Sequence, residues 1–326
     1  MLKSQTFAHT LLAAAVLFCA GATATAQDTW PSRPLKLIAP FAPAGPLDQA
    51  GRVIALKLQD ALGQPVVVEN VAGAGGGVGM ARLAQSAGDG YTVALGHVGS
   101  LSIGPHLNAK VGFDPLKSFA PITLLADYAN VLVVNASEPY ASVAELIKAA
   151  RDNPGKIAYS SSGIGSSNHL SGELLAALTG VKMTHIPHRG SAPAMLDLIG
   201  GRVNFMFDVL LNSMPNLQAG KLRALAVTNN SGLARLPGVP PLSKTVPGYE
   251  VLGWVALLAS AGTPPRVVER LHMEVEKIMK LPDVVAHYAT VGFEVRTSTP
   301  AELQALIKKD LDLWGPLIKA TGARSD

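Results

Sequence analysis

The sequence has one cysteine and few charged or aromatic residues. Cys19 is the only cysteine among 326 residues, and charged and aromatic residues make up 15% and 5% of the chain. A single cysteine excludes an intrachain disulfide, and its place in the N-terminal stretch argues against thiol catalysis. The scarcity of charge and the lack of any Lys/Arg cluster argue against a nucleic-acid-binding protein.

The usual catalytic and nucleotide motifs are also missing. The chain contains no G-x-S-x-G elbow, no H-E-x-x-H pair and no G-x-x-x-x-G-K-[ST] loop. Residues 73–79 are rich in glycine but lack the spacing of a dinucleotide loop, so we interpret them as a tight turn. His185 and His188 flank a proline without a third ligand, which favours structural histidines over a metal site. We therefore expect no enzyme, no metal and no cofactor.

The N-terminus has the pattern of a cleavable secretory signal. Lys3 precedes a short apolar run at residues 11–20, and the small residues Ala24-Thr25-Ala26 follow. The run is too short to span a membrane, which takes roughly 20 residues. Residues 1–26 are thus predicted to be removed on export to the periplasm. Loss of Lys3 lowers the formal net charge from +4 to +3, which is typical of a soluble protein.

Short apolar runs alternate with helical patterns along the rest of the chain. This alternation predicts an α/β protein with parallel sheets. The expected strands are residues 35–39, 66–69, 91–96, 122–125, 131–135, 157–160, 183–186, 204–208, 223–228 and 254–259. The expected helices are residues 47–62, 76–85, 143–150, 168–178, 192–199, 265–279, 283–290 and 300–321.

No Pro/Gly-rich linker divides the chain. If there are two lobes, strands must cross between them, and the candidate crossings are residues 126–131 and 249–254. We therefore expect one lobe from residues 27–128 and 252–326 and a second lobe from residues 129–251.

Two strand–turn–helix junctions stand out as anion sites. In the first, residues 40–48, Gly45 suits an N-cap, Pro46 the first helical position and Asp48 the positive helix end. The alternative is an ordinary helix N-terminus that binds no ligand. The second junction, residues 159–169, holds five serines and two glycines, with Ser166 or Ser167 as N-cap. A helix cap needs fewer small hydrogen-bond donors than this, so the composition favours a turn that binds a ligand.

Two further side chains have two interpretations each. His169 lies in the first turn of a predicted helix and either touches a ligand or packs. Asp208 ends an apolar strand, where a carboxylate is either a ligand acceptor or a residue leaving the sheet.

Together these motifs resemble the Bug-type receptors, the periplasmic solute-binding subunits of tripartite tricarboxylate transporters. The resemblance covers essentially all of the chain after the signal. It is carried by residues 30–34, 40–41, 62–70, 73–76, 89–92, 119–122, 153–156, 160–169, 189–194, 206–208 and 219–226.

The resemblance implies a fold like the type II periplasmic binding proteins: two α/β lobes, a central cleft and hinge-crossing strands. It also implies capture of a small organic carboxylate, delivery to integral-membrane permease subunits, and a monomer without cofactor. Ligand-binding residues carried over onto this chain are Phe41, Ala42, Ala44, Gly45, Asp48, Ser100, Ser162, Gly163, Ser166, Ser167, Arg189 and Asp208.

One position departs from the family pattern. Pro46 stands where the family usually has a second glycine, and proline has no N–H to offer a carboxylate. Either water replaces that donor or the bound group differs from the family's commonest. His97 and Ser100, in the turn after a predicted strand, are further candidates for shaping ligand choice.

Three functions are compatible with the residues. The first is the receptor that hands an organic anion to a permease. The second is an exported hydrolase with Ser162 or Ser166 and His169, although no orienting acid is evident. The third is a sensory receptor with the same fold and a signalling partner.

Overall fold

The computed structural model describes residues 30–108, 110–188, 190–233 and 235–321. The chain divides into two units, residues 1–32 and 33–326, and the fold described here is that of the second. The predicted signal at residues 1–26 lies outside the described residues.

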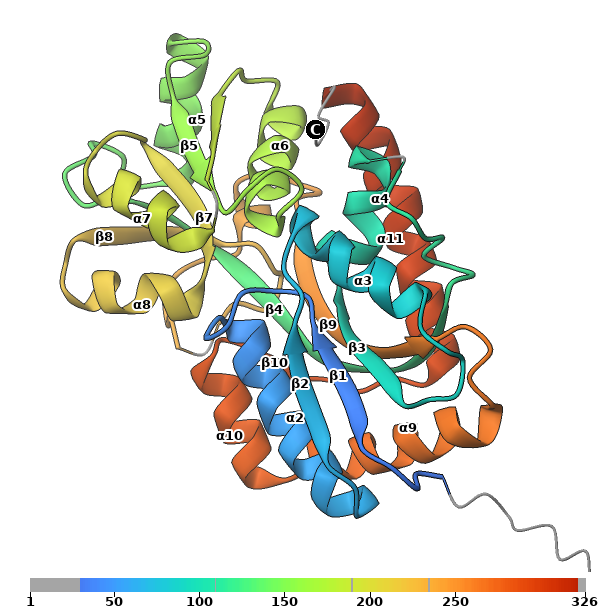
Figure 1. The fold of residues 1–326 in the computed structure, drawn as a ribbon. Coiled ribbons are helices and arrows are strands. Elements are labelled where there is room, and N and C mark those ends of the chain that lie inside the picture. The colour runs from blue at the N-terminus through green and yellow to red at the C-terminus, as the bar shows by residue number, and fades with distance from the viewer. Residues whose placement is uncertain (1–29, 109, 189, 234, 322–326) are drawn as a thin grey trace, which may run out of the picture. The chain divides into compact units, whose positions relative to one another are not determined.

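Three parallel strands form the first part of the sheet (Figure 1). β1 (Leu35–Ala39) lies between β2 (Val66–Asn70) and β3 (Thr92–His97), with which it pairs in parallel. Helix α2 (Pro46–Leu62) joins β1 to β2, and α3 (Gly77–Ala84) joins β2 to β3. The apolar side chains of β1 and β3 are almost fully buried, as strands covered on both faces require.

A second set of parallel strands repeats this order. β5 (Ala158–Ser161) lies between β6 (Thr184–Pro187) and β7 (Phe205–Val209). Helix α6 (Ser167–Thr179) joins β5 to β6, and α7 (Ser191–Ile199) joins β6 to β7. In each set, the strand that comes first along the chain lies between the other two.

The long strand β4 (Phe119–Asn135) connects the two sets. Its residues 119–129 pair with β9 (Leu252–Ser260), and its residues 130–135 pair with β7 and with β8 (Leu222–Val227). We name β1, β2, β3, β9 and β4 up to residue 129 the first sheet region. The second sheet region is β4 from residue 130 with β5, β6, β7 and β8. The two sets pair in parallel as the sequence predicts, whereas all pairings of β4 and that of β9 with β3 are antiparallel, so the whole sheet is mixed.

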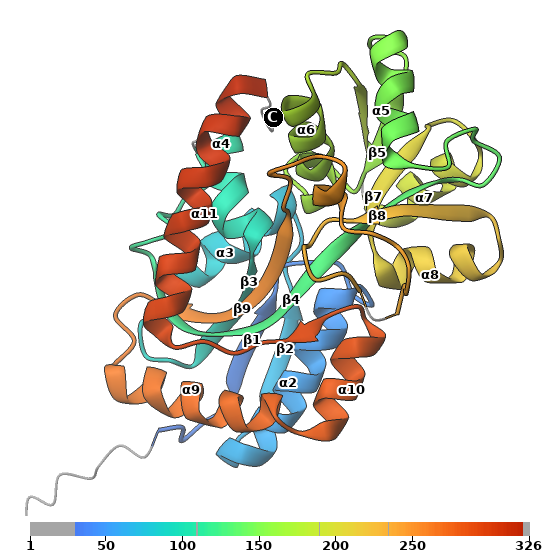
Figure 2. The same cartoon turned by 180° about the vertical axis from the view of Figure 1, so that it is seen from behind.

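The remaining elements are the helices packed on the sheet and one short strand that pairs antiparallel with residues 126–127 of β4. They are η1 (Ala74–Gly76), the π-helix η2 (Gly99–Ile103), α4 (Gly104–Leu107), α5 (Val143–Asp152), α8 (Leu210–Gln218), η3 (Leu242–Lys244), α9 (Pro265–Met279), α10 (Pro282–Thr290), β10 (Glu294–Val295) and α11 (Pro300–Thr321). Seen from behind, α11 lies against β4 and η2, and α9 against β4 and α2 (Figure 2). None of the described helices is long and apolar enough to cross a membrane.

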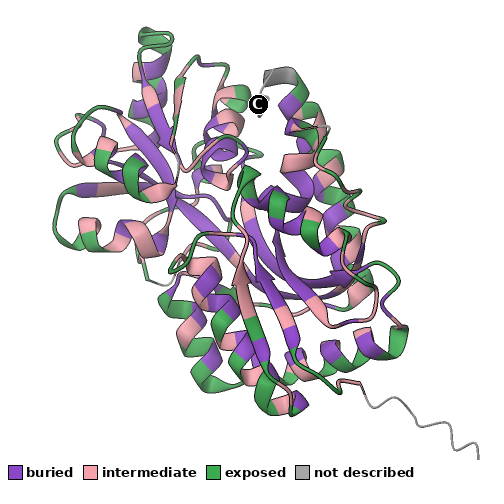
Figure 3. Cartoon of the chain, in the orientation of Figure 1, coloured by how far each residue is buried: buried purple, intermediate pink, exposed green. Residues whose placement is uncertain are grey.

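The core consists of the central strands and the helix faces turned toward them (Figure 3). The largest fully buried side chain is Trp254 on β9, whose Nε1 donates to Asp310 Oδ2 on α11 at 2.7 Å. This bond satisfies the indole N–H that burial would otherwise leave without a partner. The rigid core holds the carboxyl ends of the strands, and the turns that follow them, in place.

Candidate functional site

The predicted turns lie at equivalent places in the two sheet regions. In the first region the chain passes from β1 to β2 on one side and returns to β3 on the other. It makes the same reversal from β5 to β6 and back to β7. Ligands of α/β proteins bind outside the carboxyl ends of the strands at such a reversal. Residues 40–45 follow β1, residues 98–100 follow β3, residues 162–166 follow β5, and Asp208 lies in the last part of β7.

Asp48 stabilises the turn after β1 by accepting hydrogen bonds from it. Gly45 is the N-cap of α2 and Pro46 takes its first position, as predicted. Ala44 adopts a φ of 68°, and its N–H donates to Asp48 Oδ2 at 2.9 Å. The same oxygen accepts from Arg52 Nε at 2.9 Å, while Asp48 Oδ1 accepts from Asn70 Nδ2 at 2.7 Å. Both carboxylate oxygens therefore have partners inside the protein.

These contacts decide the charge state of Asp48. The side chain is only 2% exposed, and burial by itself would raise its pKa. Hydrogen bonds from Arg52, Asn70 and the Ala44 N–H, together with the charge of Arg52, outweigh burial and lower the pKa of Asp48. The ionised carboxylate thus shapes the turn, and its oxygens are already occupied. Asn70, which also donates to the Phe41 carbonyl at 3.1 Å, was missed by the sequence interpretation.

A neutral histidine joins the turn after β3 to the glycine-rich turn. His97 Nδ1 accepts from the Gly99 N–H at 3.0 Å, so its Nε2 carries the proton and donates to the Gly75 carbonyl at 3.2 Å. Burial lowers the pKa of His97 to about 4. The Phe41 ring packs on the imidazole with centroids 4.6 Å apart. Ser100, 1% exposed, exchanges hydrogen bonds with the His97 backbone.

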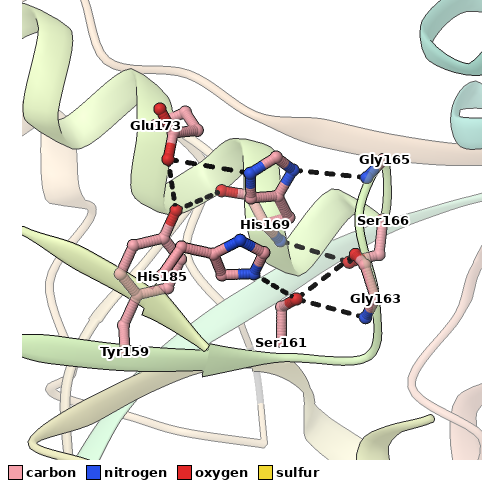
Figure 4. Close-up of polar contacts among 8 residues, drawn as sticks. All are labelled: Tyr159, Ser161, Gly163, Gly165, Ser166, His169, Glu173 and His185. Carbon is pink, nitrogen blue, oxygen red and sulfur yellow. Dashed lines mark hydrogen bonds and ion pairs between the residues drawn. The ribbon is translucent and has the colours of Figure 1, made fainter. Parts of the chain in front are cut away.

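The turn after β5 is tied together by hydroxyl groups (Figure 4). Ser166 is the N-cap of α6: its Oγ accepts from the His169 N–H at 3.2 Å and donates to the Gly163 carbonyl at 2.7 Å. Ser161 Oγ accepts from the Gly163 N–H at 3.1 Å. Gly163 and Gly165 have φ of 133° and 81°, which bulkier residues rarely adopt. The backbone therefore wraps closely around the helix start.

Two predicted site residues are linked behind this turn. Ser162 Oγ donates to Asn168 Oδ1, and Asn168 Nδ2 donates to the Phe207 carbonyl at 2.8 Å and to Asp208 Oδ1 at 3.5 Å. Ser167, at the first position of α6, lies beside the hydroxyl of Tyr128 on β4. Ser162 and Ser167 are half-buried, whereas Asp208 is fully buried.

Two histidines pack near this turn: His169 is buried and His185 is half-buried (Figure 4). His169 and His185 stack with centroids 4.0 Å apart. His169 Nδ1 accepts from the Gly165 N–H, and its Nε2 lies 3.6 Å from Glu173 Oε1. Burial lowers the pKa of His169 to about 4, and burial with the neighbouring histidines lowers that of His185 to about 3. His169 therefore packs, and the hydrolase alternative loses its base, because both ring nitrogens face groups other than Ser162 and Ser166.

The turns of the two sheet regions touch. The Gly165 carbonyl lies 3.4 Å from the place a Cβ would take on Gly99, and a Cβ on Gly165 would lie 2.5 Å from Leu107 Cδ1. A cavity of about 60 Å³ lies where Gly99 and Leu107 face Ile164 and Gly165. Phe41, His97, Gly99 and Gly165 thus form a continuous line of neighbours from one turn to the other.

A larger hollow of about 410 Å³ lies at the opposite, amino ends of β1 and β3. Arg33 occupies its wall, paired with Asp89 at 2.9 Å and seated 3.9 Å above the Tyr91 ring. An open hollow at the amino ends of the strands is not where α/β proteins bind ligands. The turns at the carboxyl ends remain the candidate site.

The predicted residues fall into three groups. Phe41, Ala44, Gly45, Asp48 and Ser100 line or hold the turns of the first region, and Ala42 is exposed between them. Ser162, Gly163, Ser166, Ser167 and Asp208 lie in the second region. Arg189 lies outside the described residues.

Known proteins share both the sequence and the fold. Residues 50–323 match the TctC family, described as tripartite tricarboxylate transporter family receptor. The periplasmic binding protein BugD is 34% identical with a TM-score of 0.80, over 91% of this chain and 100% of BugD. R. palustris Rpa4515 with adipate is 34% identical with a TM-score of 0.83, over 90% and 99% of the two chains.

A third structure, MatC from Rhodopseudomonas palustris with bound malate, is 29% identical with a TM-score of 0.78, over 89% of this chain and 100% of MatC. The Bug-type resemblance and the binding-protein fold predicted from the sequence are thereby confirmed. The chain belongs to the TctC family of tripartite tricarboxylate transporter receptors.

Proposed function

We propose that this chain is a periplasmic receptor that captures a small organic carboxylate between the turns after β1 and β5 and delivers it to a membrane permease. The observation that carries this is the pair of helix N-termini, α2 and α6, each following the central strand of a parallel set. The first N–H groups of a helix lack intrahelical partners and attract anions. The adipate and malate bound by two similar proteins are carboxylates of this kind.

The proposed ligand site uses backbone donors more than charge. Asp48 holds the first turn in shape, and Ser162 and Ser166 do the same for the second. Gly163 permits close approach, and Ser167 stands at the first position of α6. Removal of the anion from water on closure strengthens each of these hydrogen bonds.

Capture requires the turns to separate. The cavity between the turn after β5 and residues 99–107 of the first region is about 60 Å³, well below the roughly 300 Å³ of small-molecule pockets. We propose the lobe boundaries 27–128 with 252–326 and 129–251, because β4 changes its pairing partners after residue 129 and β9 begins at Leu252. Contacts that the ligand makes only in the closed state would then drive closure.

The proposal also includes export of the chain and a transporter as its partner. The N-terminal pattern of residues 1–26 supports secretion, and the family description supports a transporter as the partner. We propose a monomer that works in the periplasm without a cofactor. Capture of permease subunits from membranes by the tagged, loaded receptor would test the partner, and capture of a sensor protein instead would refute it.

A thermal-shift screen tests the function. Adipate, malate, citrate, glutamate and nicotinate are each added to the purified protein. A ligand at 100 times its Kd stabilises by about 2.7 kcal/mol. No shift with any acid at millimolar concentration would refute carboxylate capture.

A pair of matched variants tests the site. Ser166 caps α6 and Ser142 caps α5, each accepting from the N–H three residues on. Ser166→Ala and Ser142→Ala should both cost about 1 kcal/mol of stability. Only Ser166→Ala should weaken binding of the acid found by the screen, by about tenfold in a calorimetric titration. Equal affinity of the two variants would contradict a site at the α6 N-terminus.

A further inference from the structure

Asp208 has an uneven set of partners. The side chain is fully buried in the last part of β7. Its Oδ1 accepts from the Val209 N–H at 2.8 Å, Ser191 Oγ at 3.1 Å, Asn212 Nδ2 at 3.3 Å and Asn168 Nδ2 at 3.5 Å. Its Oδ2 is buried and has no hydrogen-bond partner among the described residues. One oxygen is crowded with donors while the other faces none.

The donors belong to the starts of three helices. Asn168 is the second residue of α6, Ser191 is the first of α7, and Val209 is the N-cap of α8, with Asn212 in its first turn. A single carboxyl thus holds the N-termini of α6, α7 and α8 together. Asn168 is also the partner of Ser162, so Asp208 is one side chain away from the ligand turn.

The uneven partners suit a protonated carboxyl. A protonated carboxyl has one oxygen that only accepts and one that carries the hydrogen. The donors around Oδ1 mark it as the accepting oxygen, which places any proton on Oδ2. Oδ2 has no acceptor among the described residues either, but an uncharged O–H without a partner costs less than a charged oxygen in the same place.

Among the residues that the structure describes, no charged side chain offsets this burial. The polar groups facing Asp208 are the neutral Asn168 from α6, Ser191 from α7 and Asn212 from α8, and its neighbour on β4 is the apolar Val131. Burial raises the pKa of Asp208 to about 7, although the bonds from Val209, Asn212 and Ser191 lower it. No ionisable group of the described residues is among the causes.

We propose that Asp208 is a proton-binding positioning residue, protonated on Oδ2 while an anion occupies the α6 N-terminus, so that its ionisation weakens ligand binding. The coupling, which rests on the carboxylate function proposed above, follows from charge. An ionised Asp208 and a bound anion share the positive end of α6 and repel each other through the protein interior. By linkage, an anion that raises the pKa of Asp208 is itself bound more weakly once Asp208 has lost its proton.

The expected size is a ratio of dissociation constants. For each unit by which the bound anion raises the pKa of Asp208, Kd increases about tenfold between the protonated and the ionised forms. The ligand's carboxylates remain ionised over the range used below, and His97, His169 and His185 remain neutral because their pKa values lie at about 4, 4 and 3. Comparison with the Asp208→Asn variant then assigns the change to Asp208.

Calorimetric titration of adipate at about pH 6 and about pH 9 provides the test. The wild type should bind about tenfold more weakly at the higher pH and take up protons near neutral pH. Asp208→Asn, whose amide cannot titrate, should reduce the ratio of the two Kd values to about one. Asp152→Asn, an exposed aspartate on α5 paired with Lys148, should keep the wild-type ratio.

A second measurement keeps the test decisive if Asp208→Asn does not fold. Carboxyl 13C NMR of the wild type without ligand should show one aspartate titrating near neutral pH, and adipate should move that titration upward. Adipate binding that is equal at both pH values, or a titration of every aspartate below about pH 5, would overturn the role of Asp208. Lack of binding at either pH by every acid of the thermal-shift screen, adipate and malate included, would instead refute the carboxylate function, and the coupling with it.

Discussion

Replacing Asp48 with alanine should destabilise the protein without removing a ligand contact. The substitution leaves the Ala44 N–H and Asn70 Nδ2 without the acceptors they have at 2.9 and 2.7 Å. A hydrogen bond to a charged group contributes about 1.5–3 kcal/mol, whereas the bond from Arg52, whose side chain is half exposed to water, adds little. Ala44, at a φ of 68°, also loses the contact that holds it in a strained conformation.

These contributions overlap, so we expect a loss of about 2–4 kcal/mol in the free energy of unfolding. For a chain of this size that is a fall in Tm of about 4–8 °C. Urea denaturation and differential scanning calorimetry measure the two quantities. Asp60→Ala, an exposed aspartate in the same helix, is the matched control and should change stability by less than about 0.5 kcal/mol.

Two results would refute the reasoning on Asp48. Equal stability of the Asp48→Ala and Asp60→Ala variants would mean that the buried network contributes nothing. Loss of ligand affinity in Asp48→Ala at unchanged Tm would mean that the carboxylate contacts the ligand directly. Arg52→Ala should lie close to the control, because the pair that it breaks is half exposed to water.

Two further predictions follow from the second region. Gly165→Ala and Gly180→Ala both place a methyl group at positive φ, 81° and 67°, at a backbone cost of about 1–2 kcal/mol. Only the methyl group at residue 165 meets a neighbour, Leu107 Cδ1 at 2.5 Å. Calorimetry should therefore find weakened ligand binding in Gly165→Ala alone. Equal affinities of the two variants would count against closure at this contact. The pKa of Asp208 is raised to about 7, so its contribution to stability is complete below about pH 4 and is lost as pH rises through 7. Between pH 5 and pH 8, the free energy of unfolding measured by urea denaturation should fall by about 3 kcal/mol less in Asp208→Asn than in the wild type, and equal falls would refute the raised pKa.

The helix starts of the site were predictable because their signals are local. Gly45 and Pro46 begin α2, and Ser166 caps α6, as the sequence indicated. Their turn chemistry depends on residues within a few positions of each other. The partner of Asp48, by contrast, is Asn70, which lies beside the turn only because Ala39 pairs with Asn70 in the parallel register of β1 and β2. No sequence spacing predicts partners that are so far apart along the chain.

Two elements were predicted wrongly for physical reasons. The sequence suggested separate strands at residues 122–125 and 131–135, but β4 is continuous from Phe119 to Asn135. The mixed residues between these runs hide the apolar pattern, while pairing with β9 keeps the backbone extended. Helix α8 was not predicted, because Pro215 interrupts the helical pattern of a short apolar segment.

The continuity of β4 restricts how the two sheet regions can move. The strand is hydrogen-bonded to β9 up to Ala129 and to β7 and β8 from Asn130 and Val131 onward. Sliding of one region past the other would break these pairs on both sides, whereas torsion about the strand axis spreads a small rotation over several peptide units and keeps them. The backbone thus permits one low-energy motion, a twist about the axis of β4. Opening and closing should follow that single twisting path, and substitutions that disrupt the pairing of β4 near residue 129 should alter it more than changes in any surface loop.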